Sequence, residues 1–198
     1  SGTLVIAHAA GIKVFVTGGI GGAHRGAETS MDVSSDLEEL AISDVAVVSA
    51  GVKAILDLPK TLEILETKGV PVVGYKTDEL PAFYTRTSGL KLVARADTVD
   101  EVACIMKSKW DLGIGGSVLI ANPIPQEFEA DSKVINAAIE NALVRANEEG
   151  IAGKEITPFI LSLVSEATGG DSLAANVALV ENNARLGAQI AFAFSKLV

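Results

Sequence analysis

One lysine lies in an apolar neighbourhood, directly after a run that is typical of a buried strand. Lys53 follows Gly51 and Val52 and precedes the apolar residues 54–56. When an ammonium group loses its hydration its pKa falls, and the neutral amine can attack a carbonyl carbon to form a Schiff base. A surface lysine whose stem covers apolar residues gives the same pattern and is, on the pattern alone, the more common case. Lys53 is therefore a candidate nucleophile that spacing by itself does not establish.

Carboxylates and hydroxyls gather just before a predicted helix. Asp32, Ser34, Ser35 and Asp36 all fall within residues 32–36. Their oxygens are the ligand type that Mg²⁺ and Mn²⁺ prefer. The same residue types also begin helices by capping, and Ser35 with Glu38 fits a capping box. Metal binding and helix capping are both open here, and different residues could serve each.

A glycine-rich loop, residues 17–26, follows the first predicted strand. Its glycines let the backbone approach a ligand closely and aim N–H groups at an anion, and His24 and Arg25 add donors. The spacing matches neither the dinucleotide fingerprint nor the phosphate-binding P-loop. A tight turn is the alternative, but glycines together with a His-Arg pair exceed what a turn needs. We interpret the loop as part of a ligand site.

Three further polar residues are less informative. Asn176 is polar on a largely apolar helical stretch, and the pattern leaves its role open. His8 and Cys104 have no partner at a useful spacing, so we interpret them as packing residues. Cys104 is the single cysteine, which excludes an intrachain disulfide and a Cys-x-x-Cys zinc site and favours a reducing compartment, the cytoplasm.

Short β-branched runs alternate with helical patterns over the first two thirds of the chain. Strands are predicted at residues 12–16, 44–48, 70–73 and 117–120. Helices are predicted at residues 35–42, 60–68 and 99–110. This alternation is typical of an α/β fold with a mostly parallel sheet and helices on both faces. The loops after parallel strands share one edge, so residues 18–22, residues 32–36 and Lys53 should converge there.

After Pro125 the sequence becomes almost wholly helical and should cover the sheet. Apolar stripes run through Val134, Ala138 and Ala142, then Phe159, Leu163 and Ala167, then Leu173, Val177 and Val180. Gly69 and Gly150 are placed to end two of the helices. Residues 1–7 form an apolar helical segment without a preceding strand, which is typical of a trimmed domain. We predict a single domain over residues 1–198 with its N-terminal part absent.

The composition limits the classes of partner that the protein can bind. At 198 residues with 48% hydrophobic residues, the chain can bury one ordinary core. A net charge of -9 with only 16 Lys and Arg leaves no basic stripe for a nucleic-acid backbone, although it does not exclude a small phosphorylated substrate. No run approaches the roughly 18 apolar residues of a membrane span. We therefore expect a soluble protein that binds neither nucleic acid nor membrane.

Five stretches together carry a resemblance to a known family. They are residues 11–28, 32–37, 51–58, 121–125 and 168–173. Their long ungapped motifs, in this order, resemble the pseudouridine-5'-phosphate glycosidase family, also called indigoidine-synthase-A-like. The resemblance covers essentially the whole chain, and it corresponds to the C-terminal portion of the family's enzymes.

The resemblance implies an activity and a set of site residues. It implies reversible cleavage of the C–C glycosidic bond of pseudouridine 5'-phosphate to uracil and ribose 5-phosphate, with Mn²⁺ or another divalent cation such as Mg²⁺, in a homotrimer. Lys53 matches the lysine that forms the covalent sugar adduct, and Asp32 matches the metal ligand. The substrate-binding positions are matched by Ser34, Ser35, Asp36, His24 and Asn176. An amine suits this chemistry, since its lone pair can form an iminium at C1' as a bond that has no leaving heteroatom breaks.

The chain departs from the family at its front. Family members carry a further N-terminal third, with a Glu that donates the proton and a Lys that binds substrate, and neither can be assigned here. We therefore expect little turnover from this polypeptide alone. Two alternatives remain: a non-catalytic module that binds a nucleotide or phosphosugar, and another Schiff-base lyase of the aldolase type.

Overall fold

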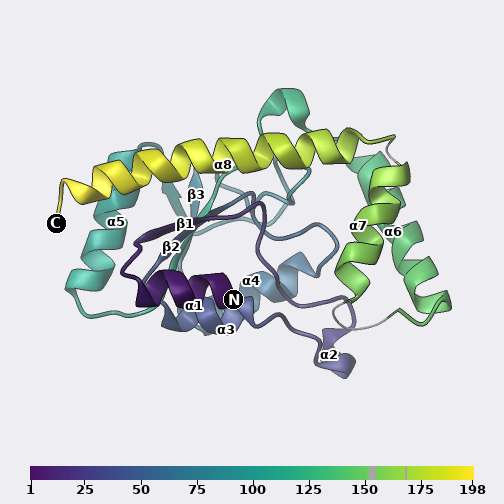
Figure 1. The fold of residues 1–198 in the computed structure, drawn as a ribbon, viewed down its shortest axis with the longest axis horizontal. Helices are drawn as coiled ribbons and strands as arrows, with labels where there is room; N and C mark the ends of the chain where they lie inside the picture. The colour runs from purple at the N-terminus through teal and green to yellow at the C-terminus, as the bar shows by residue number, and fades with distance from the viewer. Residues whose placement is uncertain (152–154, 168) are drawn as a thin grey trace.

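The fold is built on one parallel sheet. The computed structural model describes residues 1–151, 155–167 and 169–198, and its five strands lie in the order β1-β2-β5-β3-β4 with every neighbouring pair parallel (Figure 1). The strands are β1 (Val14–Val16), β2 (Ala46–Ser49), β3 (Val72–Tyr75), β4 (Ala94–Ala96) and β5 (Val118–Ala121). The predicted α/β class is confirmed. Four strands lie where the β-branched runs predicted them, within two residues at each end.

The edge strand β4 escaped prediction for a physical reason. It has three residues, Ala94, Arg95 and Ala96, none of which is β-branched or aromatic. It pairs with one neighbour only, β3. Such a strand takes its conformation from the ladder beside it and not from local preference.

The other named elements of the described chain are helices. Their bounds are α1 (Gly2–Ala9), α2 (Ala27–Ser30), α3 (Asp36–Ile42), α4 (Leu58–Thr67), α5 (Val99–Asp111), η1 (Gln126–Phe128), α6 (Ser132–Glu148), α7 (Ile156–Ala167) and α8 (Asp171–Ser195). Gly69 and Gly150 follow α4 and α6 with φ of 69° and 68°, as predicted for helix ends. None of the described helices is both long and apolar enough to cross a membrane.

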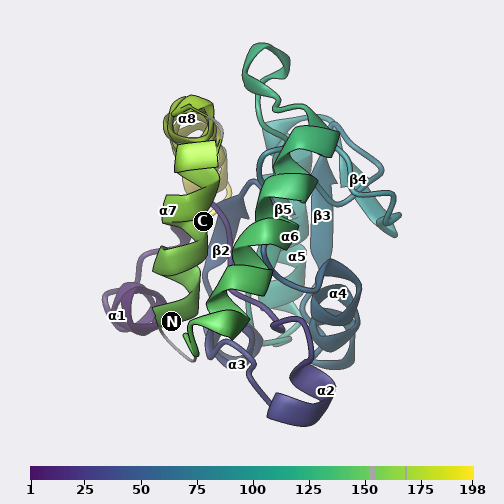
Figure 2. The same cartoon turned by 90° about the vertical axis from the view of Figure 1, so that its right-hand side faces the viewer.

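The helices cover both faces of the sheet, as predicted (Figures 1 and 2). On one face, Val48 and Ile120 pack with α5 and the C-terminal half of α8. On the other, Val47 and Leu119 share a core with Leu4 of α1 and with α3 and α4. Helix α8 runs across the whole molecule in Figure 1, while α6 and α7 lie side by side at one end.

The predicted apolar face of α8 is wrong, because the helix buries a different face. Leu173, Val177 and Val180 are exposed, and the buried face carries Ser172, Ala175, Leu179, Asn183 and Leu186. The pattern misled because two polar residues lie on the buried face, where a periodicity argument expects apolar ones.

Smaller corrections concern α6, α7, His8 and Cys104. In α6, Ala138 and Ala142 are buried as predicted but Val134 is exposed, and in α7 Phe159 and Leu163 are partly buried while Ala167 is exposed. His8 and Cys104 are exposed and do not serve as packing residues. The His8 ring instead accepts a hydrogen bond at Nδ1 from the Asp44 N–H, at 2.9 Å.

Candidate active site

The glycine loop lies against the segment that carries Lys53. Ile20 and Val52 form a parallel bridge beyond the ends of β1 and β2. The Ile20 N–H donates to the Gly51 carbonyl at 3.1 Å, and the Lys53 N–H donates to the Ile20 carbonyl at 3.2 Å. The convergence predicted from parallel-strand logic is therefore present at this edge.

Residues 32–36 close the other side of the same loop. Ala23 and Val33 form an antiparallel bridge, and the Ser34 N–H donates to the Gly22 carbonyl at 3.0 Å. The Gly21 N–H donates to Asp36 Oδ2 at 2.9 Å. A side chain at position 21 has no room, since its Cβ would lie 2.9 Å from that same carboxylate oxygen. The glycine is thus required by close approach.

Asp36 holds a negative charge beside Lys53. Burial raises the pKa of the Asp36 carboxyl, whereas the hydrogen bond from the Gly21 N–H lowers it. The positive charge of Lys53 also lowers this pKa. Asp36 is therefore a hydrogen-bond acceptor for the glycine loop that lies within the electrostatic reach of Lys53.

The predicted capping box at Ser35 and Glu38 is wrong. Ser35 has φ -62° and ψ -9°, an α conformation, and its side chain caps nothing. An N-cap hydroxyl needs an extended backbone to reach the N–H groups of the first turn. The Ser35 hydroxyl instead contacts the Ser1 hydroxyl at 2.9 Å, and Ser34 Oγ accepts from the Asp36 N–H at 3.2 Å.

Lys53 itself is half-buried between two buried neighbours, Val52 and Ile55. Within the described part of the chain its ammonium makes no hydrogen bond or salt bridge. Its interaction with Asp36 is electrostatic and acts without direct contact. The lysine therefore matches neither a fully exposed surface residue nor a structural ion pair, and its amine is free to meet a ligand.

A short segment that the sequence did not single out forms a roof over this site. The Phe83 N–H donates to the Ala50 carbonyl at 3.0 Å, and the Phe83 ring lies 2.6 Å from where a Cβ on Gly19 would be. Phe83 has φ 65°, unusual for a bulky residue. Its ring meets Tyr84 edge to face at 4.7 Å. Two adjacent aromatics, in a chain with 5% aromatic residues, were the available signal.

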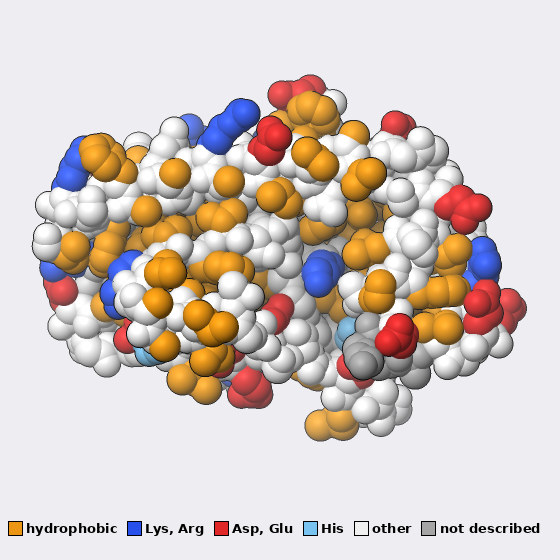
Figure 3. Space-filling view, viewed as in Figure 1, with side chains coloured by type: hydrophobic (Ala, Val, Ile, Leu, Met, Phe, Trp, Pro, Cys, Tyr) orange, Lys and Arg blue, Asp and Glu red, His pale blue; other side chains and the backbone are white. Residues whose placement is uncertain are grey.

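His24 is part of the glycine loop, and Asn176 of α8 lies close to it. The His24 N–H donates to the Asp32 carbonyl at 3.0 Å, which sets these two predicted residues side by side. Asn176 projects from α8 over Gly18, with Oδ1 3.4 Å from where a Cβ on that glycine would be. In Figure 3, a Lys or Arg side chain and a His side chain are visible in the depression between α1 and α7. The loop thus contacts every segment that carries a predicted site residue.

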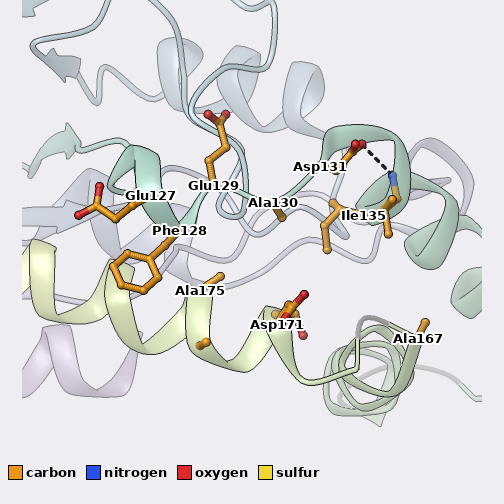
Figure 4. Close-up of a pocket in the computed structure, with 12 residues that line it drawn as sticks. Glu127, Phe128, Glu129, Ala130, Asp131, Ile135, Ala167, Asp171 and Ala175 are labelled. Carbon is orange, nitrogen blue, oxygen red and sulfur yellow. Dashed lines mark hydrogen bonds between the residues drawn. The ribbon is translucent and has the colours of Figure 1, made fainter.

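Two cavities border the loop and a third lies apart from it. One of about 180 Å³ is lined by Thr17, Gly19 and Asp36, and one of about 500 Å³ by Arg25 and Ala54. The third, about 550 Å³, lies between η1, α6, α7 and α8 (Figure 4). It contains no predicted site residue. The Asp131 carboxylate on its wall accepts N–H bonds from the first turn of α6 and so serves as a helix cap.

The described residues do not form a complete set of metal ligands. Among them, no group of three or more His, Cys, Asp and Glu side chains is arranged to hold an ion. The half-buried Asp32 provides one carboxylate at the rim of the glycine loop. A cation here would need water and ligand oxygens to complete its shell.

Known proteins are similar to this chain in sequence. The chain is 58% identical over 197 residues to a pseudouridine-5'-phosphate glycosidase of Caldanaerobacter subterraneus subsp. tengcongensis, covering 100% of the chain and 64% of that protein. It is 58% identical over 195 residues to the glycosidase of the same name from Petrotoga mobilis, covering 98% and 64%. The chain thus spans about 64% of the length of these curated relatives.

Solved structures with a similar sequence have the same fold. The prealnumycin C-glycosynthase AlnA, in complex with ribulose 5-phosphate, has a TM-score of 0.93 at 39% identity, covering 99% of this chain and 65% of that one. An indigoidine synthase A (IdgA)-like protein of Thermotoga maritima has a TM-score of 0.88 at 40% identity, covering 96% and 62%. Residues 1–193 match the family described as indigoidine synthase A like protein. The chain belongs to this family, as its motifs predicted.

Proposed function

We propose that the full-length protein cleaves and forms the C–C glycosidic bond of pseudouridine 5'-phosphate, with Lys53 as the nucleophile. The observation that carries the proposal is the half-buried Lys53, which has no direct partner among the described residues and lies near enough to the Asp36 carboxylate to interact with it electrostatically. The relatives that are 58% identical are named as glycosidases of this substrate. AlnA, named a C-glycosynthase, supports the same class of bond.

The chemistry uses the amine twice. The Lys53 amine adds to C1' of the ribose as the ring oxygen leaves that carbon and takes up a proton. The nitrogen lone pair then forms a C=N bond while the bond from C1' to the uracil ring breaks. The electron pair of that bond goes to the uracil carbon, which gains a proton. Water hydrolyses the imine, which releases ribose 5-phosphate and restores the amine.

Other residues of the chain bind and orient the sugar phosphate in this proposal. Ser34, Ser35 and Asp36 offer hydroxyl and carboxylate groups at the glycine loop. His24, within the loop, and Asn176, near Gly18, add further polar groups. Fixing the sugar relative to the amine replaces a bimolecular encounter by a positioned one. The proton donor is expected on the part of the relatives' length that this chain does not span.

A divalent cation fits the site in one way. The single carboxylate of Asp32 suits Mn²⁺ or Mg²⁺ held largely through water and substrate oxygens, since such ions keep several waters. When bound, the cation would supply positive charge to oxygens of the substrate. The proposal also includes a homotrimer, which the family resemblance implies, and a cytoplasmic location, which the single cysteine favours.

Turnover by the full-length protein tests the function. We expect it to convert pseudouridine 5'-phosphate to uracil and ribose 5-phosphate, and Lys53→Arg to abolish this because a guanidinium with a pKa above about 12 is never a free amine at neutral pH. Lys60→Arg is the matched control, because Lys60 serves Asp57 and Glu28 as an ion-pair partner. Binding of the substrate without turnover would instead indicate a non-catalytic module. Turnover of other carbonyl substrates alone would indicate a different Schiff-base lyase.

A further inference from the structure

Helix α8 carries a fully buried amide above the sheet. Asn183 is 0% exposed, and both the oxygen and the nitrogen of its side-chain amide form hydrogen bonds. Its Nδ2 donates to the Thr17 carbonyl at 2.9 Å and to the Gly18 carbonyl at 3.4 Å. Its Oδ1 accepts from Asn122 Nδ2 at 2.9 Å. A buried amide with these partners lies in a defined orientation, since its donors and its acceptor are both engaged.

These bonds join the ends of three neighbouring strands. Thr17 and Gly18 follow β1, and the Gly18 carbonyl also accepts from the Ala50 N–H, after β2, at 2.8 Å. Asn122 follows β5, and its N–H donates to the Ser49 carbonyl at 2.8 Å. The amide pair therefore fixes the position of the glycine loop relative to the sheet.

The loop passes that position on to the proposed nucleophile. Gly18 and Gly19 have no side chains that could anchor this part of the loop by packing. Two residues further, the Ile20 carbonyl accepts the N–H of Lys53 at 3.2 Å. A displacement of the loop at Gly18 is thus transmitted through one backbone hydrogen bond to Lys53, the residue that carries the amine.

We infer that Asn183, held by Asn122, is a positioning residue for Lys53. This inference rests on the proposed function, because it assigns Asn183 a part in the same site. Asn183 acts without touching the substrate: it keeps the glycine loop, and with it the amine, in the geometry that the attack on C1' needs. Misplacing reacting groups by about 1 Å can lower a rate about 100-fold, so small shifts of this loop matter.

Asn183→Asp in the full-length protein is the sharpest test. The carboxylate has nearly the same shape and still accepts from Asn122, but it cannot donate to Thr17 and Gly18. We expect kcat for pseudouridine 5'-phosphate to fall about 10- to 100-fold per folded molecule, with KM changed less than about threefold. Hydrogen exchange at residues 17–22 should quicken in the same variant.

Two controls separate positioning from general stability. Ile190→Ala removes a fully buried apolar side chain from the same helix, away from the loop, and should lower the melting temperature with kcat retained. Asn182→Asp changes the half-buried neighbour, whose amide donates to the Pro123 carbonyl at 3.2 Å, and should leave the exchange at residues 17–22 unchanged.

Each remaining outcome also decides the question. If Asn183→Asp keeps the wild-type kcat per folded molecule, the inference is overturned, whatever its melting temperature. If it does not fold, Asn122→Asp decides in its place: lowered kcat supports positioning and unchanged kcat overturns it. If the wild-type protein lacks this activity, the proposed function fails, and hydrogen exchange at residues 17–22 alone decides whether Asn183 anchors the loop.

Discussion

Gly51 is the position where the backbone leading to Lys53 has least freedom. Its φ is +80°, and an added Cβ would overlap the Pro81 carbonyl oxygen and lie 2.9 Å from the Pro81 carbonyl carbon. In Gly51→Ala the left-handed conformation costs about 1–2 kcal/mol. The overlap with backbone adds about 1–3 kcal/mol, because the Pro81 carbonyl has no rotamer through which to yield. We expect the free energy of unfolding to fall by about 2–5 kcal/mol, a large part of the 5–15 kcal/mol typical of a domain.

A matched glycine isolates the overlap. Gly69 has φ +69° with nothing within 4 Å of an added Cβ, so Gly69→Ala carries the conformational cost alone. Urea unfolding followed by circular dichroism gives both free energies at 25 °C. Gly51→Ala should be the less stable variant by at least about 1 kcal/mol. Equal losses in the two variants would refute the contact between Gly51 and Pro81 as the reason for glycine here.

Three further predictions concern groups around the site. Thr61→Val should lower the free energy of unfolding by about 1–3 kcal/mol in urea titrations, because the buried Ala23 N–H loses its acceptor at 3.0 Å. Thr61→Ser keeps the hydroxyl acceptor and should retain most of the wild-type stability. Burial raises the pKa of the Tyr84 phenol, against a hydrogen bond with Ser172. The buried, protonated phenol therefore contributes its full stabilisation below the pKa near 10 of the unfolded state, and this contribution declines as the pH rises above that value. Wild-type protein should accordingly lose more free energy of unfolding than Tyr84→Phe between about pH 9 and 11. Parallel losses in the two proteins would contradict this. Asp32→Asn in the full-length protein should abolish the response of turnover to added Mn²⁺ after EDTA treatment, and wild-type turnover that EDTA leaves unchanged would count against a metal at Asp32.

Much of the fold follows from local pattern. The strands that were predicted are runs of β-branched residues, which suit a sheet covered on both faces. Gly69 and Gly150 mark helix ends because only glycine accepts a positive φ at little cost. Parallel strands then place their loops at one edge, which is why Lys53, Asp36 and the glycine loop could be expected together.

The rest depends on contacts between distant residues. Asn183 lies 0% exposed on α8 because it pairs with Thr17 and Asn122, and no local periodicity contains that information. The same holds for Phe83, whose place above Gly19 is set by a bond to the Ala50 carbonyl. A buried polar residue with distant partners looks, in sequence, like an exposed one.

Reductive trapping shows whether Lys53 forms a covalent bond with the sugar. The full-length protein is incubated with ribose 5-phosphate, treated with borohydride, digested and analysed by mass spectrometry. We expect the reduced sugar phosphate on Lys53, none on the ion-paired Lys60, and no trapped sugar in Lys53→Arg. A sugar trapped on another residue, or turnover at the wild-type rate in Lys53→Arg, would contradict it.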